Sequence, residues 1–232
     1  MCRVVSGWFQ HSSDKVPTSP SRRLDPAWPA ILVCSVLVTR ALADNDHEVE
    51  AKYHVRDLRE LIKALAQRQV VLTEPSVQDD QAYAPAGWSY GMSKIGVPFA
   101  RLRTQEGRHL FTVKKPIDNE MACLEHDCVI SDRDAMHAAL ATMGWVPTVR
   151  IVKQRRTGVW DGVTVCVDVV DGLGTFVEVE RLVSSQHSGE QVQDGLDAMI
   201  RSLGVPVLRV VDTYDTLIWN LASAAGRMSA PV

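Results

Sequence analysis

Glu48-Val49-Glu50-Ala51-Lys52 decides the expected fold, because charged and apolar side chains alternate in it one by one. Side chains of a β-strand point alternately to its two faces, so the charged three would share one face. At roughly 3.4 Å per residue they span about 14 Å. Two carboxylates on one face repel each other unless a cation or a base lies between them. The stretch therefore predicts a strand with one charged face, which is either a solvated edge or the wall of a site.

The same alternation recurs in later segments, where the charges are sorted by strand. Some segments carry bases, as in Arg101-Leu102-Arg103, in Lys153-Gln154-Arg155 and at Lys114. Others carry acids, as in Glu178-Val179-Glu180 and at Asp168, which follows a run of alternating valines. A sheet with one solvated face would show mixed charges with Thr, Ser and Gln between them. The sorted pattern favours a tunnel or cleft lined by charge.

A cleft lined in this way has a definite chemical use. Lys and Arg bind polyanions through charge-assisted hydrogen bonds, and carboxylates hold hard divalent cations. A triphosphate site needs both, because a metal ion and basic side chains share the neutralisation of the phosphoryl groups. The pattern therefore favours a triphosphate site over a solvated sheet face.

Apolar residues at helical spacing separate the charged strands. These stripes are expected to form helices that cover the outward Val and Leu side chains, which leaves the charges inside. The order of strand, helix and further strands occurs twice, near 47–120 and 122–180, and suggests a duplicated half. The stripes run over 58–65, 136–143, 192–203 and 214–221.

Short local signals refine these expectations. Ser131 with Asp134 is typical of a capping box before the second stripe, and Gly144 is a natural helix end. The Gly/Pro-rich stretch 84–98 predicts a loop. Its Trp88 and Tyr90 either stack on a substrate base, cover the mouth of the tunnel, or belong to a hairpin tip that packs on the barrel itself. A hairpin turn is expected at Gly172-Leu173-Gly174, because a strand rather than a helix follows it.

Length and composition exclude several classes of protein. A chain of 232 residues with 46% hydrophobic and 23% charged residues suits one globular domain with a sizeable core. The net charge of −3 gives no bulk attraction to nucleic acid. Five cysteines without a C-x-x-C motif indicate neither a disulfide framework nor a zinc site. We therefore expect no nucleic-acid partner, and phosphate binding as a local property.

Residues 1–44 do not follow the strand pattern. They contain a Ser/Pro-rich stretch, an arginine pair, and an apolar run from Ala27 to Val38 that a proline interrupts. The run is too short to span a bilayer, so no membrane partner is expected, although the region mimics a secretory signal. We expect instead an N-terminal extension over 1–44 that is disordered or precedes the true start. A catalytic domain over 45–225 and a tail over 226–232 would follow.

Read in order, the charged segments resemble the CYTH superfamily, which joins class IV adenylyl cyclases and thiamine triphosphatases. Glu48-x-Glu50-x-Lys52 is similar to the family's opening signature, and the resemblance covers about residues 47–220. The block Gly172-Leu173-Gly174-Thr175-Phe176 is most similar to the bacterial class IV cyclase branch. The resemblance implies an α+β fold: an antiparallel eight-stranded β-barrel of the triphosphate-tunnel type, with a charged lumen and helices packed outside. The other matching blocks are Leu102-Arg103, Val113-Lys114-Lys115-Pro116, Lys153-x-Arg155, Asp168 and Glu178-x-Glu180.

The resemblance also implies a role for each matching residue. The acids would hold a divalent cation, Mg²⁺ or Mn²⁺, and the bases would bind substrate phosphates. Glu50, Glu178 and Lys52 would be the catalytic residues. The implied metal ligands are Glu48, Glu50, Asp168, Glu178 and Glu180, and the implied substrate-binding residues are Lys52, Arg101, Arg103, Lys114, Lys153 and Arg155.

The chain departs from the family pattern at two places. Where members often have Arg-x-Glu-x-Glu, this sequence has Cys123-Leu124-Glu125-His126-Asp127 and lacks the arginine. The arginine that usually precedes Ser/Thr-Tyr near the C-terminus is also absent, because Asp212 precedes Thr213-Tyr214. Both departures bear on phosphate contacts and on substrate preference.

Three functions fit these residues. The first is a metal-dependent enzyme of the class IV adenylyl cyclase type, which converts ATP to cyclic AMP and pyrophosphate. The alternative is a triphosphatase that hydrolyses thiamine triphosphate, a nucleoside triphosphate or inorganic triphosphate. The third is a non-catalytic binder of nucleotide or polyphosphate. Each implies a small-molecule triphosphate as partner and a cytoplasmic location, and each is compatible with a homodimer.

Overall fold

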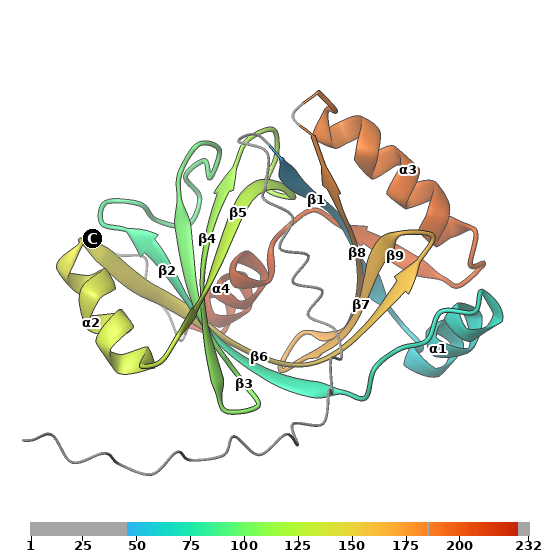
Figure 1. The fold of residues 1–232 in the computed structure, drawn as a ribbon, viewed down its shortest axis with the longest axis horizontal. Coiled ribbons are helices and arrows are strands. Elements are labelled where there is room, and N and C mark those ends of the chain that lie inside the picture. The colour runs from blue at the N-terminus through green and yellow to red at the C-terminus, as the bar shows by residue number, and fades with distance from the viewer. Residues whose placement is uncertain (1–45, 185, 227–232) are drawn as a thin grey trace, which may run out of the picture. The chain divides into compact units, whose positions relative to one another are not determined.

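The computed structural model of the protein describes residues 46–184 and 186–226, in which nine strands form one antiparallel sheet (Figure 1). They are β1 (His47–Val55), β2 (Ser76–Pro85), β3 (Phe99–Gln105), β4 (Arg108–Pro116), β5 (Ala122–Ile130), β6 (Trp145–Trp160), β7 (Val163–Val170), β8 (Gly174–Val183) and β9 (Val207–Val210). The strand order is β5-β4-β3-β2-β6-β7-β8-β1-β9. The sheet closes into a ring because the start of β1 also pairs with β5, at Glu48↔Cys123 and Val49↔Ala122. The predicted eight-stranded antiparallel barrel is confirmed, and β9 is a further strand on the other part of β1.

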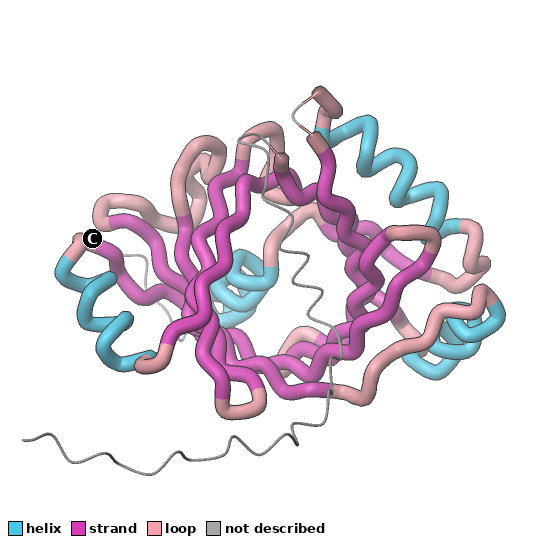
Figure 2. Tube along the Cα trace, viewed as in Figure 1, coloured by secondary structure: helices cyan, strands magenta, loops and turns pink. Residues whose placement is uncertain are grey.

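Four helices in the described chain pack against this sheet (Figure 2). α1 and α3 form a core with the outward side chains of β1, β7 and β8. α2 covers β2 and β3, whereas α4 packs against β6 with its first turn directed into the ring. None of the described helices combines the length and apolar character needed to cross a membrane. Their bounds are α1 (Leu58–Gln67), α2 (Arg133–Thr142), α3 (Gly189–Arg201) and α4 (Tyr214–Ala224).

Local signals explain where these helices begin and end. Asp57 caps α1, because its carboxylate accepts hydrogen bonds from the backbone N–H groups of the first turn. The capping box predicted at Ser131 is wrong by one residue: Asp132 caps α2, through its carboxylate and the N–H of Ala135. Gly144 follows α2 with φ +84°, a conformation that glycine adopts without strain, as its predicted role as a helix end requires.

The alternation in β1 has the predicted consequence. Ala51 and Tyr53 are buried under α1 and α3, and Val49 is also fully buried, while Glu50 and Lys52 face the inside of the ring. Full burial of a side chain such as that of Val49 contributes about 1.5–3 kcal/mol, and such burial helps to offset the cost of enclosing charges on the opposite face.

The order of elements confirms that the strand–helix–strands arrangement occurs twice. β1-α1-β2-β3-β4 is followed by β5-α2-β6-β7-β8, so each half contributes one strand, one helix and three more strands. The halves join where β4 pairs with β5, where β2 pairs with β6 and where β1 pairs with β8. The inside of the ring is therefore built from both halves.

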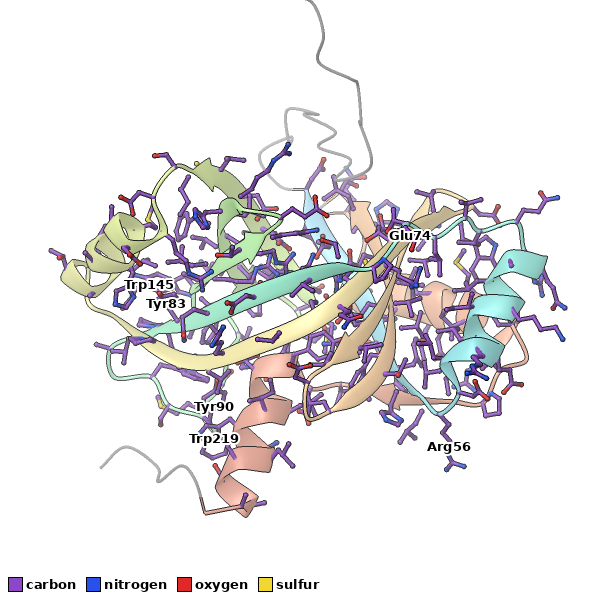
Figure 3. All side chains as sticks on the ribbon, turned by 90° about the horizontal axis from the view of Figure 1, so that it is seen from below. Arg56, Glu74, Tyr83, Tyr90, Trp145 and Trp219 are labelled. Atoms are coloured by element: carbon purple, nitrogen blue, oxygen red, sulfur yellow. The ribbon has the colours of Figure 1, made fainter. Side chains whose placement is uncertain are left out.

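Two predicted connections can be located. The Gly172–Gly174 stretch is the turn between β7 and β8, with φ +78° at Gly172 and +99° at Gly174. In the loop between β2 and β3, Tyr90 stacks on Trp219 of α4, with ring centroids 4.8 Å apart (Figure 3). Among the alternatives left open for this loop, Tyr90 thus packs on the protein itself. The expected N-terminal extension over 1–44 and residues 227–232 of the expected tail lie outside the described residues.

Candidate active site

The charged strand faces line one cavity inside the ring. Eight of the eleven predicted site residues contribute to its wall: Glu50, Lys52, Arg101, Lys114, Lys153, Arg155, Glu178 and Glu180. The other three lie directly behind them. Glu48 contacts Lys114, Asp168 contacts Lys153 and Arg155, and Arg103 contacts Asp80, a lining residue that the sequence analysis did not single out. The structure thus gathers all eleven residues around one space, and their individual roles remain predictions.

Asp168 and Glu178, here called the paired acids, are bonded to bases. Asp168 is fully buried and accepts hydrogen bonds from Arg155 at 2.6 and 2.7 Å, from Lys153 at 3.0 Å and from the hydroxyl of Tyr214 at 3.0 Å. Glu178 contacts Lys52 at 3.2 Å and also Arg155. Burial opposes ionisation, but the charges of Arg155 and Lys153 lower the pKa of Asp168, and those of Lys52 and Arg155 lower the pKa of Glu178.

Glu48, Glu50 and Glu180, here called the acid trio, have a different surrounding. One carboxylate oxygen of each lies within 4.8 Å of the other two. Burial and the neighbouring Glu125 raise the pKa of Glu48 well above its ordinary value. Burial, together with Glu178 and Glu50, raises the pKa of Glu180 to about 7 although Arg155 acts against it. Negative charge is thus in excess where the trio meets.

This donor set fits a hard divalent cation. Mg²⁺ and Mn²⁺ prefer carboxylate oxygens, and a cation between the three groups would relieve the repulsion among their buried charges. The described chain gathers such a set at the acid trio. The paired acids point instead to Lys and Arg, so the predicted metal role of Asp168 and Glu178 stays a prediction.

Arg101 on β3 and Lys114 on β4 form a basic wall, and β5 separates β4 from β1. Lys114 lies 2.6 Å from Glu125, and Arg101 lies 3.5 Å from the same residue and donates to Thr112 at 2.9 Å. Burial opposes ionisation of Glu125, but Lys114 and Arg101 lower its pKa to about 2. The buried Nε of Arg101 has no hydrogen-bond partner among the described residues. Arg101 also lines the cavity, and an unpartnered guanidinium N–H is suited to an anionic oxygen.

Asp80 was missed by the sequence analysis. It is 3% exposed, and its two oxygens accept from Nε and Nη2 of Arg103 at 2.7 Å each. Burial opposes ionisation, but Arg103 lowers the pKa of Asp80. The neighbouring Asp79 points outward to Arg150, so both faces of β2 are charged and the stretch shows no alternation. Pairing with another strand was needed to identify Asp80.

Lys94 and Tyr214 were also missed. Lys94 belongs to the loop between β2 and β3, where no period marks a residue as facing inward. Tyr214 was read as part of an apolar helix stripe, and its hydroxyl instead reaches Asp168. Lys94 carries no sequence signal that separates it from an ordinary loop lysine, whereas Tyr214 stands in the Thr213-Tyr214 pair of the family pattern, which is the signal that could have found it.

Comparison with known proteins settles the family. The model of the CYTH domain matches residues 46–214. The chain belongs to the CYTH domain family. A Methanocaldococcus jannaschii protein, named as a candidate adenylate cyclase, is 22% identical over 160 residues, covering 68% of this chain and 90% of the relative. This result confirms the resemblance that was based on the charged segments.

Solved CYTH-like structures confirm the fold. The structure of a Pyrococcus horikoshii protein superposes with a TM-score of 0.64 and 25% identity, and covers 75% of this chain and 99% of the other. A candidate adenylyl cyclase from Hippeastrum, described as having a dominant triphosphatase activity, gives a TM-score of 0.51 and 13% identity. That match covers 79% of this chain and 97% of the other, and it bears on the fold alone.

Proposed function

We propose that this CYTH domain protein is a divalent-cation-dependent enzyme that acts on a nucleoside or other organic triphosphate inside the ring. The observation that carries the proposal is the division of charge around one cavity. The acid trio, in which the pKa values of Glu48 and Glu180 are raised, lies beside a basic wall where the buried Arg101 Nε has no hydrogen-bond partner among the described residues. A bound cation and a bound polyanion would satisfy both features together.

The acid trio would hold the cation, Mg²⁺ or Mn²⁺. When bound there, the ion would neutralise phosphate charge and increase the acidity of an attacking hydroxyl or water. Glu50 and Glu180 border the cavity directly, and Glu48 reaches the same point from behind Lys114.

The bases would bind and orient the phosphates. Lys114 and Arg101 on one side, and Lys153 and Arg155 on the other, each present nitrogen donors to the cavity. These donors now bond to carboxylates, and phosphate oxygens would be additional acceptors for them. The low dielectric constant inside the ring would strengthen each of these contacts. Through these contacts the donors would stabilise charge that develops on the leaving phosphate oxygens.

Lys52 would act as a fixed positive charge rather than as a base. Burial favours its neutral form, but Glu50 and Glu178 raise its pKa above the ordinary value. Lysine in this state keeps its proton and can only donate. It is therefore suited to stabilising the transferring phosphoryl group, which agrees with its predicted catalytic role.

The aromatic side of the cavity favours an organic substrate. Trp88 and Phe99 line it next to the charged part, edge to face, with ring centroids 4.8 Å apart. Aromatic side chains offer a surface on which a planar ring can stack. Inorganic triphosphate would leave that part of the cavity without a partner.

Two reactions remain within this proposal. In the first, that of an adenylyl cyclase, the ribose 3′-hydroxyl of ATP attacks the α-phosphorus and pyrophosphate leaves, as the name of the Methanocaldococcus relative suggests. In the second, a triphosphatase, water attacks the terminal phosphorus, as the activity described for the Hippeastrum protein suggests. The two differ in which phosphorus lies beside the acid trio.

Product analysis tests the proposal. The purified protein is incubated with ATP, thiamine triphosphate or inorganic triphosphate, first with Mg²⁺ and then with Mn²⁺, and the products are separated by chromatography. Cyclic AMP with pyrophosphate supports the cyclase, and inorganic phosphate supports the triphosphatase. Binding without turnover would identify a non-catalytic binder, and neither binding nor turnover would contradict the proposal.

A further inference from the structure

Lys94 is held by three side chains at the start of α4. It lies in the loop between β2 and β3 and is 5% exposed. Its Nζ donates to Thr213 Oγ1 at 2.5 Å, to Thr216 Oγ1 at 2.7 Å and to Asp215 at 3.1 Å. Glu120 Oε2 lies 3.2 Å away on the other side. The three N–H groups of this lysine are thus taken up within the protein.

These contacts go against the usual preferences at a helix start. Side chains of the N-cap residues accept backbone hydrogen bonds in α1, α2 and α3, whereas Thr213 at the start of α4 makes no such bond within the described chain. Its hydroxyl accepts from Lys94 instead. A cation is also unfavourable beside a helix N-terminus, and a buried lysine needs compensation. A site that departs from several local preferences at once is often functional.

Tyr214 lies between the residues that Lys94 holds. Its hydroxyl donates to Asp168, and its ring centroid lies 4.3 Å from Lys52 Nζ and 4.8 Å from Lys153 Nζ. The carbonyl oxygen of Asp212, just before the helix, is 3.4 Å from Lys52 Nζ. The start of α4 therefore contacts two of the lysines that line the predicted triphosphate site, Lys52 and Lys153.

The rest of the loop is attached to the same helix. Tyr90 stacks on Trp219 of α4 (Figure 3), and the planes of the two rings make an angle of 18°. Trp88 of the same loop lines the cavity. Loop and helix thus meet at an aromatic contact and at Lys94. Of these two contacts, the one at Lys94 is closer to Tyr214, because Lys94 bonds Thr213 and Asp215, the residues immediately before and after Tyr214.

We propose that Lys94 is a positioning residue, which fixes the first turn of α4 so that Tyr214 and the Asp212 carbonyl hold Lys52 and Lys153 in place for a triphosphate. The inference rests on the proposed function for its ligand class. Lys94 acts through α4, and its own donors stay with Thr213, Asp215 and Thr216. Its removal would then matter only as long as Tyr214 is present.

A double-mutant cycle tests this dependence. Binding of inorganic triphosphate, which probes the phosphate contacts alone, is measured by calorimetry for Lys94→Met, Tyr214→Leu and the double variant. We expect Lys94→Met to weaken binding about 10-fold, and to add less than about 2-fold once Tyr214 is replaced, because coupled residues are not additive. Lys63→Met, which removes an exposed lysine on α1, is the matched control and should bind like the unmodified protein.

The outcomes separate the inference from the proposed function. Additive losses of affinity in the double variant would mean that Lys94 contacts the ligand itself. Unchanged binding in Lys94→Met would mean that Lys94 neither contacts the ligand nor positions α4. Either result overturns the inference. If Lys94→Met fails to fold, Thr213→Val, which removes one acceptor, should weaken binding in the same direction. Failure of the unmodified protein to bind triphosphate would contradict the proposed function. In that case amide hydrogen exchange of residues 213–224 would still test the inference. Faster exchange in Lys94→Met would support a role of Lys94 in holding α4 in place, and unchanged exchange would overturn it.

Discussion

Glu178 and Glu180 lie two residues apart on β8 and face the same cavity, yet their carboxyl groups have opposite properties. The pKa of Glu178 is lowered, whereas that of Glu180 is raised to about 7. Glu178 is the more buried of the two, with 4% of its side chain exposed against 17% for Glu180. Burial alone would give the reverse order, so the bases within reach decide the charge state.

The same difference separates the paired acids from the acid trio. Asp168 has donors from three residues at 2.6–3.0 Å, whereas the nearest bases to the trio lie at 3.2 Å from Glu48, 3.4 Å from Glu50 and 3.7 Å from Glu180. The paired acids are thus neutralised by the protein. The trio has charge left over, which a cation can neutralise.

Removing a paired acid should have the largest effect on stability. Asp168→Ala would leave Lys153 and Arg155 buried without their main acceptor, and loss of one partner of a buried pair costs about 3–5 kcal/mol. Urea unfolding should show that decrease in the free energy of unfolding. Glu48→Gln, in the acid trio, should leave the free energy of unfolding unchanged or higher. Equal losses of stability in the two variants would mean that the paired acids and the acid trio do not differ in this respect.

Removing the base shared by both groups should have the next largest effect. Arg155 contacts Asp168, Glu178 and Glu180. Arg155→Ala should reduce turnover by roughly 30- to 1000-fold, about 2–4 kcal/mol of transition-state stabilisation, because a donor to the phosphates is lost. Steady-state kinetics with the substrate found by product analysis measures this change.

Arg156 supplies the control. It donates to the carbonyl of Thr73, outside the ring, and its removal should be nearly silent. If Arg156→Ala reduces turnover strongly and Arg155→Ala only slightly, the register of β6 is shifted by one residue. The residues assigned to the inside of the ring would then be wrong.

Neutralising one member of the trio should affect activity but not the fold. Glu50→Gln keeps the shape of the side chain and removes a charge needed for a hard cation. Turnover at saturating Mg²⁺ should fall about 100-fold or more, which corresponds to about 2.7 kcal/mol. The free energy of unfolding in urea should stay constant or rise, because repulsion within the trio decreases. Unchanged turnover would argue against a cation at this place.

The smallest expected effect is a pH dependence of stability without divalent cation. The pKa of Glu180 rises from 4.5 to about 7 on folding, so between these values the folded state binds more protons than the unfolded state. Raising the pH through this window therefore lowers the free energy of unfolding. The paired acids act in the opposite sense, because their lowered pKa values cost stability only as the pH falls below their ordinary range. Urea unfolding at pH 5, 6 and 7 with a chelator should show the decrease. Glu180→Gln should make it smaller, and Glu48, whose pKa is also raised, should leave a slope of the same sign.

Much of the fold could be predicted from alternation alone. Residues 48–52 alternate without interruption, and the structure places Val49 and Ala51 in the core and Glu50 and Lys52 in the cavity. The repeated order of strands and helices was also visible. β9 and its pairing with the second part of β1 were not predicted, because four residues carry too little pattern.

The sequence predicts which strand face each site residue lies on, but not which side chains it contacts. Alternation assigns Glu178 and Glu180 to the same face, and only the pairing of β8 with β1 and β7 shows which bases each one meets. Asp80 was hidden because the outward Asp79 is charged as well. Lys94 lies in a loop, where no period tells inside from outside. Each of these depends on contacts between segments distant in the sequence.

Manganese binding tests the central claim most directly. Free Mn²⁺ is measured by its electron paramagnetic resonance signal during titration of the unmodified protein, Glu180→Gln and Glu178→Gln, with circular dichroism as a check on folding. The unmodified protein should bind Mn²⁺, Glu180→Gln should bind at least about 10-fold more weakly, and Glu178→Gln should keep its affinity within about 3-fold. Loss of binding in Glu178→Gln with retention in Glu180→Gln would contradict the assignment of the cation to the acid trio.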